Sequence, residues 1–344
     1  MTSLADVLAG RDNDHRPHTT AFTARTRLGW HTPTPPEAGE GTGVSVVIPA
    51  HNNDYSLPAV LDALDARRHL QTRVEVIVVD DASTDDTGRI AAKHRAVDRV
   101  MRFPQKRGPA AARNLGTFLA TWPTVIYLDA DMVIAPHVLT DMAVRAHPEL
   151  VLVGFRQNVP YSRGRDDTPI VPGLEPDLAA DHRVLWKPPV GKPMFYSGQV
   201  YTAPLVGHPL DDTDDFRDLG NGRAYFDWDL PRMLVTALVA VPRAKVADVG
   251  GFDPGFGPDG WGSEDTHLGA ALAAAGCKIV PLRQARGWHI DPPDADAAWQ
   301  AKFATAAARI AHYRHLLTLP APTGKAGEFA ATGARLLTET EDLR

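Results

Sequence analysis

The chain has 344 residues, of which 44% are hydrophobic and 23% are charged. These are ordinary values for globular proteins, and they exclude a wholly disordered or collagen-like chain. The formal net charge of -6 at pH 7 has the wrong sign for a protein whose main task is to bind nucleic acid. The length favours one large domain, or one domain with a smaller appendage.

The first thirty residues predict neither export nor a membrane anchor. They carry several charged side chains and no apolar run, so they lack the pattern of a secretory signal. The most apolar later stretch, residues 233–241, is about half of the roughly 20 residues that a membrane-spanning helix needs. The single cysteine, Cys277, stands before an apolar run and favours a buried thiol over a nucleophile. We therefore expect a soluble, cytoplasmic protein without a membrane span.

The first half of the chain predicts alternating strands and helices. Residues 1–42 are polar and end in a run rich in proline and glycine, which predicts a flexible lead-in. A β-branched run closed by Pro49 then resembles a buried parallel strand. Together with the segments that follow it, the predicted strands are 44–48, 74–79, 100–103 and 124–128, and the predicted helices are 57–64, 90–95 and 110–120. This order predicts an α/β fold with a mostly parallel, Rossmann-like sheet flanked by helices.

The second half is less regular. Residues 160–230 are rich in proline and glycine, which predicts a loop-rich insert, and long loops of this kind often form lids or substrate surfaces in enzymes. Order returns with a strand candidate at 234–242 and a helix after Glu264. A further helical pattern runs over 294–318, so residues 292–344 are expected to form a C-terminal helical extension.

Three polar clusters, at 49–54, 80–87 and 129–131, each follow a predicted strand. Because ligands bind at the carboxyl ends of parallel strands, we expect these clusters to converge on one edge of the sheet. Asp129 and Asp131 are separated by one alanine, and in extended backbone residues i and i+2 point the same way. Both carboxylates could therefore reach one divalent cation that bridges a diphosphate. The alternative is an ordinary acidic surface turn.

Two further clusters could contact a nucleotide. Asp80 and Asp81 end the second strand, where they could accept hydrogen bonds from a nucleobase or a ribose, or simply form a capping turn. Arg113 and Asn114 lie in the first turns of a helix that follows a glycine, where their donors could meet a nucleotide. Ordinary helix-surface charge is the alternative for this pair.

Acidic and aromatic residues also gather in the second half, in Trp261-Gly-Ser-Glu264-Asp265. The indole could lie against a sugar face, and a carboxylate at the start of a helix could take a proton from an acceptor. A capped helix N-terminus explains the same residues without chemistry. Further along, His289 could join Asp131 in a mixed oxygen and nitrogen site that suits manganese, although a lone histidine is more often a satisfied polar residue.

Read in order, six motifs resemble those of glycosyltransferase family 2: Val44-Ser-Val-Val-Ile-Pro-Ala-His-Asn, Val78-Val-Asp-Asp-Ala-Ser-Thr-Asp-Asp-Thr, Gly108-Pro-Ala-Ala-Ala-Arg-Asn, Leu128-Asp-Ala-Asp, Gly250-Gly-Phe-Asp and Trp261-Gly-Ser-Glu-Asp. The resemblance implies the GT-A fold over residues 43–291. Its nucleotide-binding half would be 43–135, and its acceptor and catalytic half would be 231–291. The lead-in, the insert and the C-terminal helices are not explained by it.

The resemblance also implies roles for residues that match the motifs. Asp131 would ligate Mn²⁺ or Mg²⁺, with Asp129 close to the metal or the ribose and His289 completing the metal shell. Asp265 would be the catalytic base, and Glu264 would bind acceptor or donor sugar. The other contacts to the nucleotide sugar would be Pro49, Ala50, Asn52, Asp80, Asp81, Arg113, Ala130 and Trp261.

These roles imply an inverting single displacement on a nucleotide-diphosphate sugar, with a UDP-sugar expected first. Processive family members carry Gln-x-x-Arg-Trp and membrane helices, and this chain shows neither, so a non-processive enzyme with a soluble acceptor is expected. A sugar-phosphate nucleotidyltransferase is a rival, but it should carry Gly-x-Gly-x-Arg where this chain has Pro49-Ala-His-Asn. A non-catalytic carbohydrate-binding protein is another, yet decay should have erased some acidic positions, and Asp131, Glu264 and Asp265 remain.

Overall fold

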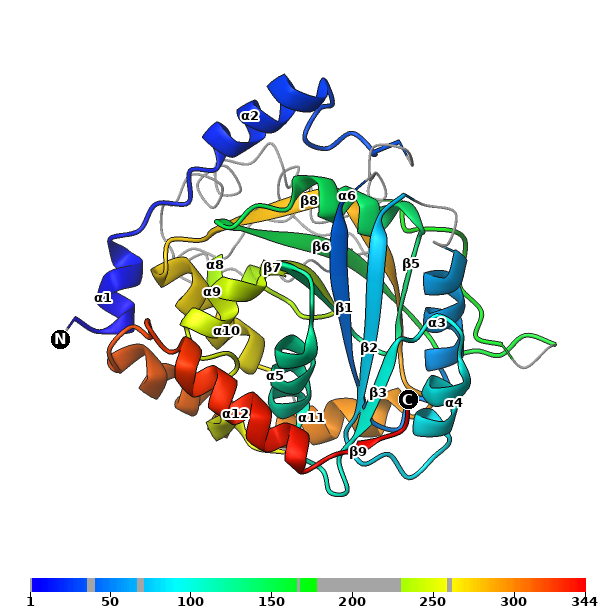
Figure 1. The fold of residues 1–344 in the computed structure, drawn as a ribbon. Helices are drawn as coiled ribbons and strands as arrows, with labels where there is room; N and C mark the ends of the chain where they lie inside the picture. The colour runs from blue at the N-terminus through cyan, green and yellow to red at the C-terminus, as the bar shows by residue number, and fades with distance from the viewer. Residues whose placement is uncertain (1, 36–40, 67–70, 166–167, 178–229, 259–261) are drawn as a thin grey trace.

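The computed structural model describes residues 2–35, 41–66, 71–165, 168–177, 230–258 and 262–344. These residues form one nine-stranded sheet with helices on both sides (Figure 1). The strands are β1 Gly43–Ala50, β2 Arg73–Asp80, β3 Arg99–Arg102, β4 Thr124–Leu128, β5 Met132–Ile134, β6 Leu150–Val159, β7 Leu238–Pro242, β8 Lys278–Ile290 and β9 Glu341–Asp342. The α/β class expected from the sequence is confirmed.

The helices fall between the strands much as their apolar periodicity predicts. They are α1 Leu4–Ala9, α2 Arg16–Thr26, α3 Leu57–Asp65, α4 Thr87–Lys93, α5 Pro109–Leu119, α6 His137–Arg145, α8 Leu230–Met233, α9 Arg243–Asp248, α10 Glu264–Ala274, α11 Ala295–Thr318 and α12 Ala326–Thr338. The strand predicted at 234–242 is shorter than expected, because residues 230–233 form α8 and the ladder starts at Leu238.

The sheet has the order β5-β8-β6-β7-β4-β1-β2-β3-β9. Strands β3, β2, β1 and β4 are parallel neighbours, as the alternating pattern predicts. Beyond β4 the sheet becomes mixed, since β7 is antiparallel to both β4 and β6 while β6 and β8 are parallel. Strands β5 and β9 add antiparallel edges. Most strands therefore still run in one direction.

The core has two layers because successive residues of a strand point to opposite faces. In β1, Val47 belongs to the cluster that packs under α5, α10 and α12, whereas Val46 and Ile48 belong to the cluster that packs under α3, α4 and α6. A strand that is covered on both faces needs apolar residues at consecutive positions. This need explains why β1 reads as an unbroken apolar run.

Residues 2–35 differ from the expected flexible lead-in. Helix α1 starts with a capping box at Ser3 and buries Leu4 and Leu8, four positions apart, against α10 and α11. Phe22 of α2 and Trp30 after it are buried in the second core layer. The polar composition of this segment concealed a few apolar side chains with the spacing needed for docking.

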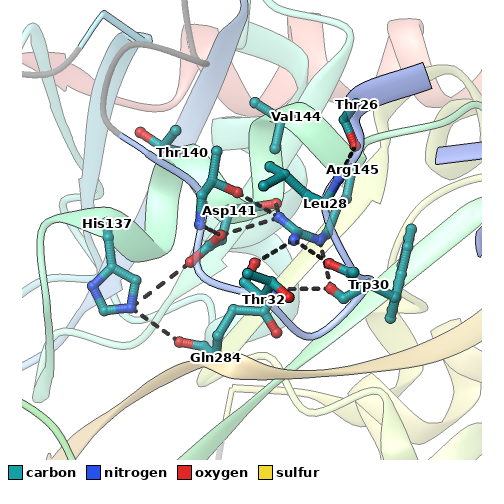
Figure 2. A network of polar contacts seen from close by, with 12 residues as sticks. Thr26, Leu28, Trp30, Thr32, His137, Thr140, Asp141, Val144, Arg145 and Gln284 are labelled. Carbon is teal, nitrogen blue, oxygen red and sulfur yellow. Dashed lines mark hydrogen bonds and ion pairs between the residues drawn. The ribbon is translucent and has the colours of Figure 1, made fainter. Parts of the chain in front are cut away.

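A buried arginine on α6 holds the stretch after α2 (Figure 2). Arg145 donates to the carbonyls of Trp30 at 2.8 Å and Thr32 at 2.6 Å, and to Thr34 Oγ1 at 2.6 Å. It also forms an ion pair with Asp141 Oδ1 at 3.0 Å, and that same oxygen accepts the Thr34 N–H at 2.8 Å. The N-terminal segment is thus fixed to the sheet by polar as well as apolar contacts.

The predicted insert is described only at its beginning, and residues 178–229 lie outside the described residues. Its first part is attached to β8, because Arg286 pairs with Glu175 at 2.6 Å and the Trp288 indole N–H donates to the Gly173 carbonyl at 2.7 Å. The helix predicted at 294–318 is observed as α11, and α12 follows it to pack on α5 and α9. Within the described ranges, no helix combines the length and the apolar character needed to cross a bilayer.

Candidate active site

The two carboxylates after β4 lie beside a histidine that is far away in sequence. Asp129 and Asp131 occupy the turn between β4 and β5, and β5 pairs with β8 so that Met132 is opposite His289. The Ile290 N–H donates to the Asp131 carbonyl at 2.9 Å and fixes the register of this contact. Sheet pairing therefore unites the three residues that the sequence proposed as one metal site.

These three side chains have the geometry of a potential cation site. His289 Nε2 lies 3.2 Å from Asp131 Oδ1 and 3.9 Å from Asp129 Oδ2. One ligand atom from each residue lies within 4.8 Å of the other two. Although buried, Asp131 Oδ1 and His289 Nδ1 make no hydrogen bond to any described residue. Two carboxylates and an imidazole are a donor set that suits Mn²⁺, so the residues fit a divalent cation.

The electrostatics of this cluster depend on a balance between burial and opposite charges. Burial acts to raise the pKa of Asp129, but the contacts with His289 and Arg113 outweigh it and hold that pKa well below its usual range. Burial raises the pKa of Asp131. Burial acts to lower the pKa of His289, but the two carboxylates outweigh it and raise that pKa. The two carboxylates thus need a positively charged partner, and either protonated His289 or a bound metal cation can supply it.

Arg113 connects this cluster to the second acidic pair. From α5, its Nη2 donates to Asp129 Oδ1 at 2.9 Å and its Nη1 to Glu264 Oε1 at 3.4 Å. The other Glu264 oxygen accepts from Arg309 Nη2 at 3.0 Å and from the Gly262 N–H at 2.7 Å. Glu264 is buried, and both its oxygens are engaged by the protein. It therefore positions the loop before α10 and the two arginines.

Asp265 differs from Glu264 because no arginine forms an ion pair with it within the described residues. It lies in the first turn of α10, is partly exposed, and accepts the Thr266 N–H through Oδ1 at 2.7 Å. Burial and the neighbouring Glu264 raise the pKa of Asp265 to about 6, against the opposing charges of Arg113 and Lys302. A carboxylate with this pKa is largely ionised at neutral pH and accepts protons better than an ordinary aspartate.

The Gly250-Gly-Phe-Asp motif is tied to α5 by Asn114. The Asn114 side chain donates to the Phe252 carbonyl at 2.8 Å and accepts the Phe252 N–H at 2.8 Å. Gly251 has a φ of 76°, and a Cβ placed there would lie 2.4 Å from Asn114 Oδ1. The sequence left open whether Asn114 contacts a ligand, and in the structure its amide makes this backbone contact.

The two aspartates after β2 have different environments. Asp80 is fully buried, where its Oδ1 accepts the Ser83 N–H at 2.9 Å and its Oδ2 lies 3.5 Å from Arg102. The expectation that Asp80 contacts the nucleotide stays a prediction. Asp81 is also buried, and it connects to the loop before α5 by accepting the Arg107 and Gly108 N–H groups at 2.6 and 2.8 Å.

The first polar cluster is linked to the other two, as expected from the convergence of strand ends. Pro49 and Ala50 end β1, and Asn52 follows with a φ of 55°. The Asn52 side chain accepts the Thr84 N–H at 2.8 Å. Ser56 donates to the Ala130 carbonyl at 3.0 Å. The three loops thus form one continuous rim.

Three residues of this region were not found from the sequence. The hydroxyl of Tyr55 donates to Asp131 Oδ2 at 3.4 Å, and α11 contributes Arg309 and Lys302. A Cβ placed on Gly262 would lie 3.8 Å from the Lys302 side chain. No family motif covers α11, and its only sequence signal is the spacing of Lys302 and Arg309, seven positions apart on one helix face. Trp261, which was expected at the sugar, lies outside the described residues.

Parts of this chain are similar to known glycosyltransferases. Residues 45–186 match the family model "Glycosyl transferase family 2". This part of the chain is therefore similar to glycosyltransferase family 2. One relative, validoxylamine A glucosyltransferase of Streptomyces hygroscopicus subsp. limoneus, is 29% identical over 261 residues, which are 73% of this chain and 51% of that protein. The chain spans about half the length of the first curated relatives that it matches.

Other proteins resemble the chain over shorter stretches or in fold. The poly(ribitol-phosphate) beta-N-acetylglucosaminyltransferase TarS of Staphylococcus aureus is 29% identical over 139 residues, covering 37% of this chain and 24% of TarS. Among solved structures, S. aureus TarS 1-349 aligns with a TM-score of 0.47 and 19% identity over 86% of this chain and 71% of that one. Glucosyl-3-phosphoglycerate synthase from Mycobacterium tuberculosis aligns with a TM-score of 0.44 and 15% identity over 82% of each chain.

Proposed function

We propose that this chain is a metal-dependent, inverting glycosyltransferase of family 2. It transfers a sugar from a nucleoside diphosphate sugar, with a UDP-hexose as the first donor to test, to a hydroxyl group of a soluble acceptor. One observation carries the proposal: Arg113 contacts Asp129 and Glu264 at once, so that the potential cation site and the carboxylate pair of α10 lie in one site.

The donor half of the proposed site consists of Asp129, Asp131 and His289, which would hold Mn²⁺ or Mg²⁺. A divalent cation there supplies charge neutralisation for a departing diphosphate. Asp80 and Asp81 after β2 are both buried, and either one is proposed to contact the nucleotide. The backbone of Pro49, Ala50 and the Asn52 loop would complete the nucleotide side of the rim.

The acceptor half depends on Asp265. Its carboxylate removes the proton from an acceptor hydroxyl, and the oxygen attacks the anomeric carbon as the bond between that carbon and the diphosphate oxygen breaks. The proton stays on Asp265, the electron pair leaves with the nucleoside diphosphate, and the configuration of the anomeric carbon inverts. A pKa of about 6 supports this role, since a base works best when its pKa lies near the working pH.

Arg113 and Glu264 are proposed as positioning residues for both halves. A buried guanidinium between two carboxylates keeps a fixed geometry, because loss of either partner would leave an uncompensated charge. Arg309 supports Glu264 from α11 and bonds to the Gly262 carbonyl at 2.8 Å. The loop that precedes α10 is in this way held next to Asp129.

The names of the relatives support a hexose donor, as they include a glucosyltransferase and an N-acetylglucosaminyltransferase. A carbohydrate-binding protein without catalysis would need neither the cation site nor a carboxylate with a raised pKa. A sugar-phosphate nucleotidyltransferase remains a second class of enzyme to separate by experiment, since it would release pyrophosphate from a nucleoside triphosphate.

The test is incubation with UDP- and GDP-linked hexoses, with and without Mn²⁺, while release of nucleoside diphosphate is followed. We expect Mn²⁺-dependent release that accelerates when a suitable acceptor is present. Pyrophosphate release from UTP and a sugar phosphate would favour the nucleotidyltransferase instead. No metal-dependent release, combined with no binding of UDP or GDP, would refute the proposal.

A further inference from the structure

Two aromatic side chains on α11 are exposed next to the proposed active site. Trp299 is 41% exposed and Phe303 is 68% exposed. Their ring centroids are 5.8 Å apart and their planes differ by 28°, so the rings form one inclined shelf. The other exposed large hydrophobic side chains in the described ranges are all aliphatic: Ile170, Leu174, Leu319 and Leu343. An exposed apolar patch of this kind is typical of a binding surface.

The pair does not contribute to the hydrophobic core. The buried residues of α11 are Arg309, Tyr313 and Leu316, all in its C-terminal half. The N-terminal half begins at an Asp294 cap, whose side chain accepts the Ala297 N–H at 3.2 Å. Because this half contributes no buried side chain, packing does not explain aromatic residues there.

Lys302 connects the shelf to the site. Its ammonium lies 4.9 Å from the centroid of the Trp299 ring, and its stem borders Gly262. Among the charges that act on Lys302 are Asp265 and Glu264, so its ammonium lies within their field. Seven positions further along the same face, Arg309 binds Glu264. The shelf is therefore continuous with the acidic residues of α10.

We infer that Trp299 and Phe303 form an acceptor subsite that takes the pyranose ring of a carbohydrate. A pyranose presents a face of C–H groups that can lie flat on an aromatic ring, and its hydroxyl edge can accept hydrogen bonds from an ammonium group such as that of Lys302. The inference rests on the proposed function, and it adds the substrate class: an acceptor that contains a sugar ring next to the hydroxyl that reacts.

The experiment uses the full chain with methyl β-D-glucopyranoside and cellobiose as probes. Saturation-transfer NMR should show contact with the C–H protons of a pyranose ring. Trp299→Ala and Phe303→Ala should each weaken binding by about ten-fold, the effect of losing one ring contact of roughly 1.4 kcal/mol. Trp299→Phe should keep binding because it keeps a ring. Gln300→Ala, exposed on the same helix, is the matched control and should behave as wild type.

Titration with UDP and Mn²⁺ separates this inference from the proposed function. Every variant should bind UDP as tightly as wild type does. If wild type binds UDP but shows no saturation transfer from either probe, or if Trp299→Ala binds both probes as wild type does, the subsite is refuted and the proposed function stands. If wild type binds neither UDP nor GDP, the proposed function is refuted and the subsite with it.

Discussion

Two buried arginines in this protein illustrate the difference between a charge that serves the fold and a charge that serves a site. Arg145 on α6 and Arg113 on α5 each pair with a carboxylate at about 3 Å, 3.0 and 2.9 Å respectively. Arg145 and its partner Asp141 are both fully buried, whereas Asp129, the partner of Arg113, is 27% exposed.

The remaining partners of the two arginines point to the same distinction. Arg145 also donates hydrogen bonds to backbone carbonyls of the N-terminal segment (Figure 2). The second terminal nitrogen of Arg113 pairs with another acidic side chain, Glu264. The Nε of Arg113 makes no hydrogen bond to any described residue. Backbone partners fix a segment in place, whereas acidic partners at a sheet edge concentrate charge that a ligand can use.

The largest expected effect falls on the site. Asp265→Asn removes the proposed base, so transfer should fall by roughly 10²- to 10⁴-fold, the usual contribution of general base catalysis. Binding of UDP with Mn²⁺ should be retained because Asp265 is not among the proposed cation ligands. Steady-state kinetics and titration calorimetry measure the two properties. Transfer within a factor of three of wild type would assign the base to another residue.

The matching change in the fold is Arg145→Met. It leaves Asp141 as an unpaired buried charge, and the free energy of unfolding should fall by about 3–5 kcal/mol. Urea denaturation measures this. Adding Asp141→Leu should restore much of the loss because no buried charge then remains. Arg16→Met, at an exposed pair with Asp14, is the control and should leave the midpoint unchanged. Equal midpoints for both single variants would contradict a structural role for Arg145.

A smaller effect concerns pH. With a pKa of about 6, Asp265 is protonated below that pH and cannot act as a base, so the rate should rise with pH and level off above about 7. The charges that act on Asp265 are Glu264, which raises its pKa, and Arg113 and Lys302, which lower it. Lys302→Met should therefore move the acid limb of the pH–rate profile to higher pH. An acid limb at the same or at a lower pH would show that Lys302 does not lower the pKa of the base.

The sequence predicted the site better where residues lie next to strand ends. Asp129 and Asp131 follow β4, and a parallel sheet places such residues at one edge. Strand β8 pairs with β5 and brings His289 to them, a long-range contact that the sequence could suggest but not establish. The sequence did not show that Asp80 and Asp81 would both be buried, because their partners are backbone N–H groups and an arginine far along the chain.

The sequence predicted the periphery less well. The docking of α1 depends on Leu4 and Leu8, a pair too sparse to stand out in a polar segment. Arg145 makes most of its hydrogen bonds to backbone carbonyls. Every residue has such a carbonyl, so the sequence does not show which residues Arg145 contacts. Lys302 and Arg309 reach the site from α11, which lies beyond every recognised motif. In each case the contact joins residues that are far apart in the sequence, and no local sequence pattern identifies the partner.

The central claim is that Asp129, Asp131 and His289 hold a cation that supports nucleotide binding. Its most direct test is calorimetric titration of UDP and GDP into wild type and Asp131→Ala, each with and without Mn²⁺. We expect wild type to bind at least one of the two nucleotides only when Mn²⁺ is present, and Asp131→Ala to lose that dependence while keeping the unfolding midpoint of wild type. Equal Mn²⁺-dependent binding by both proteins would contradict the claim.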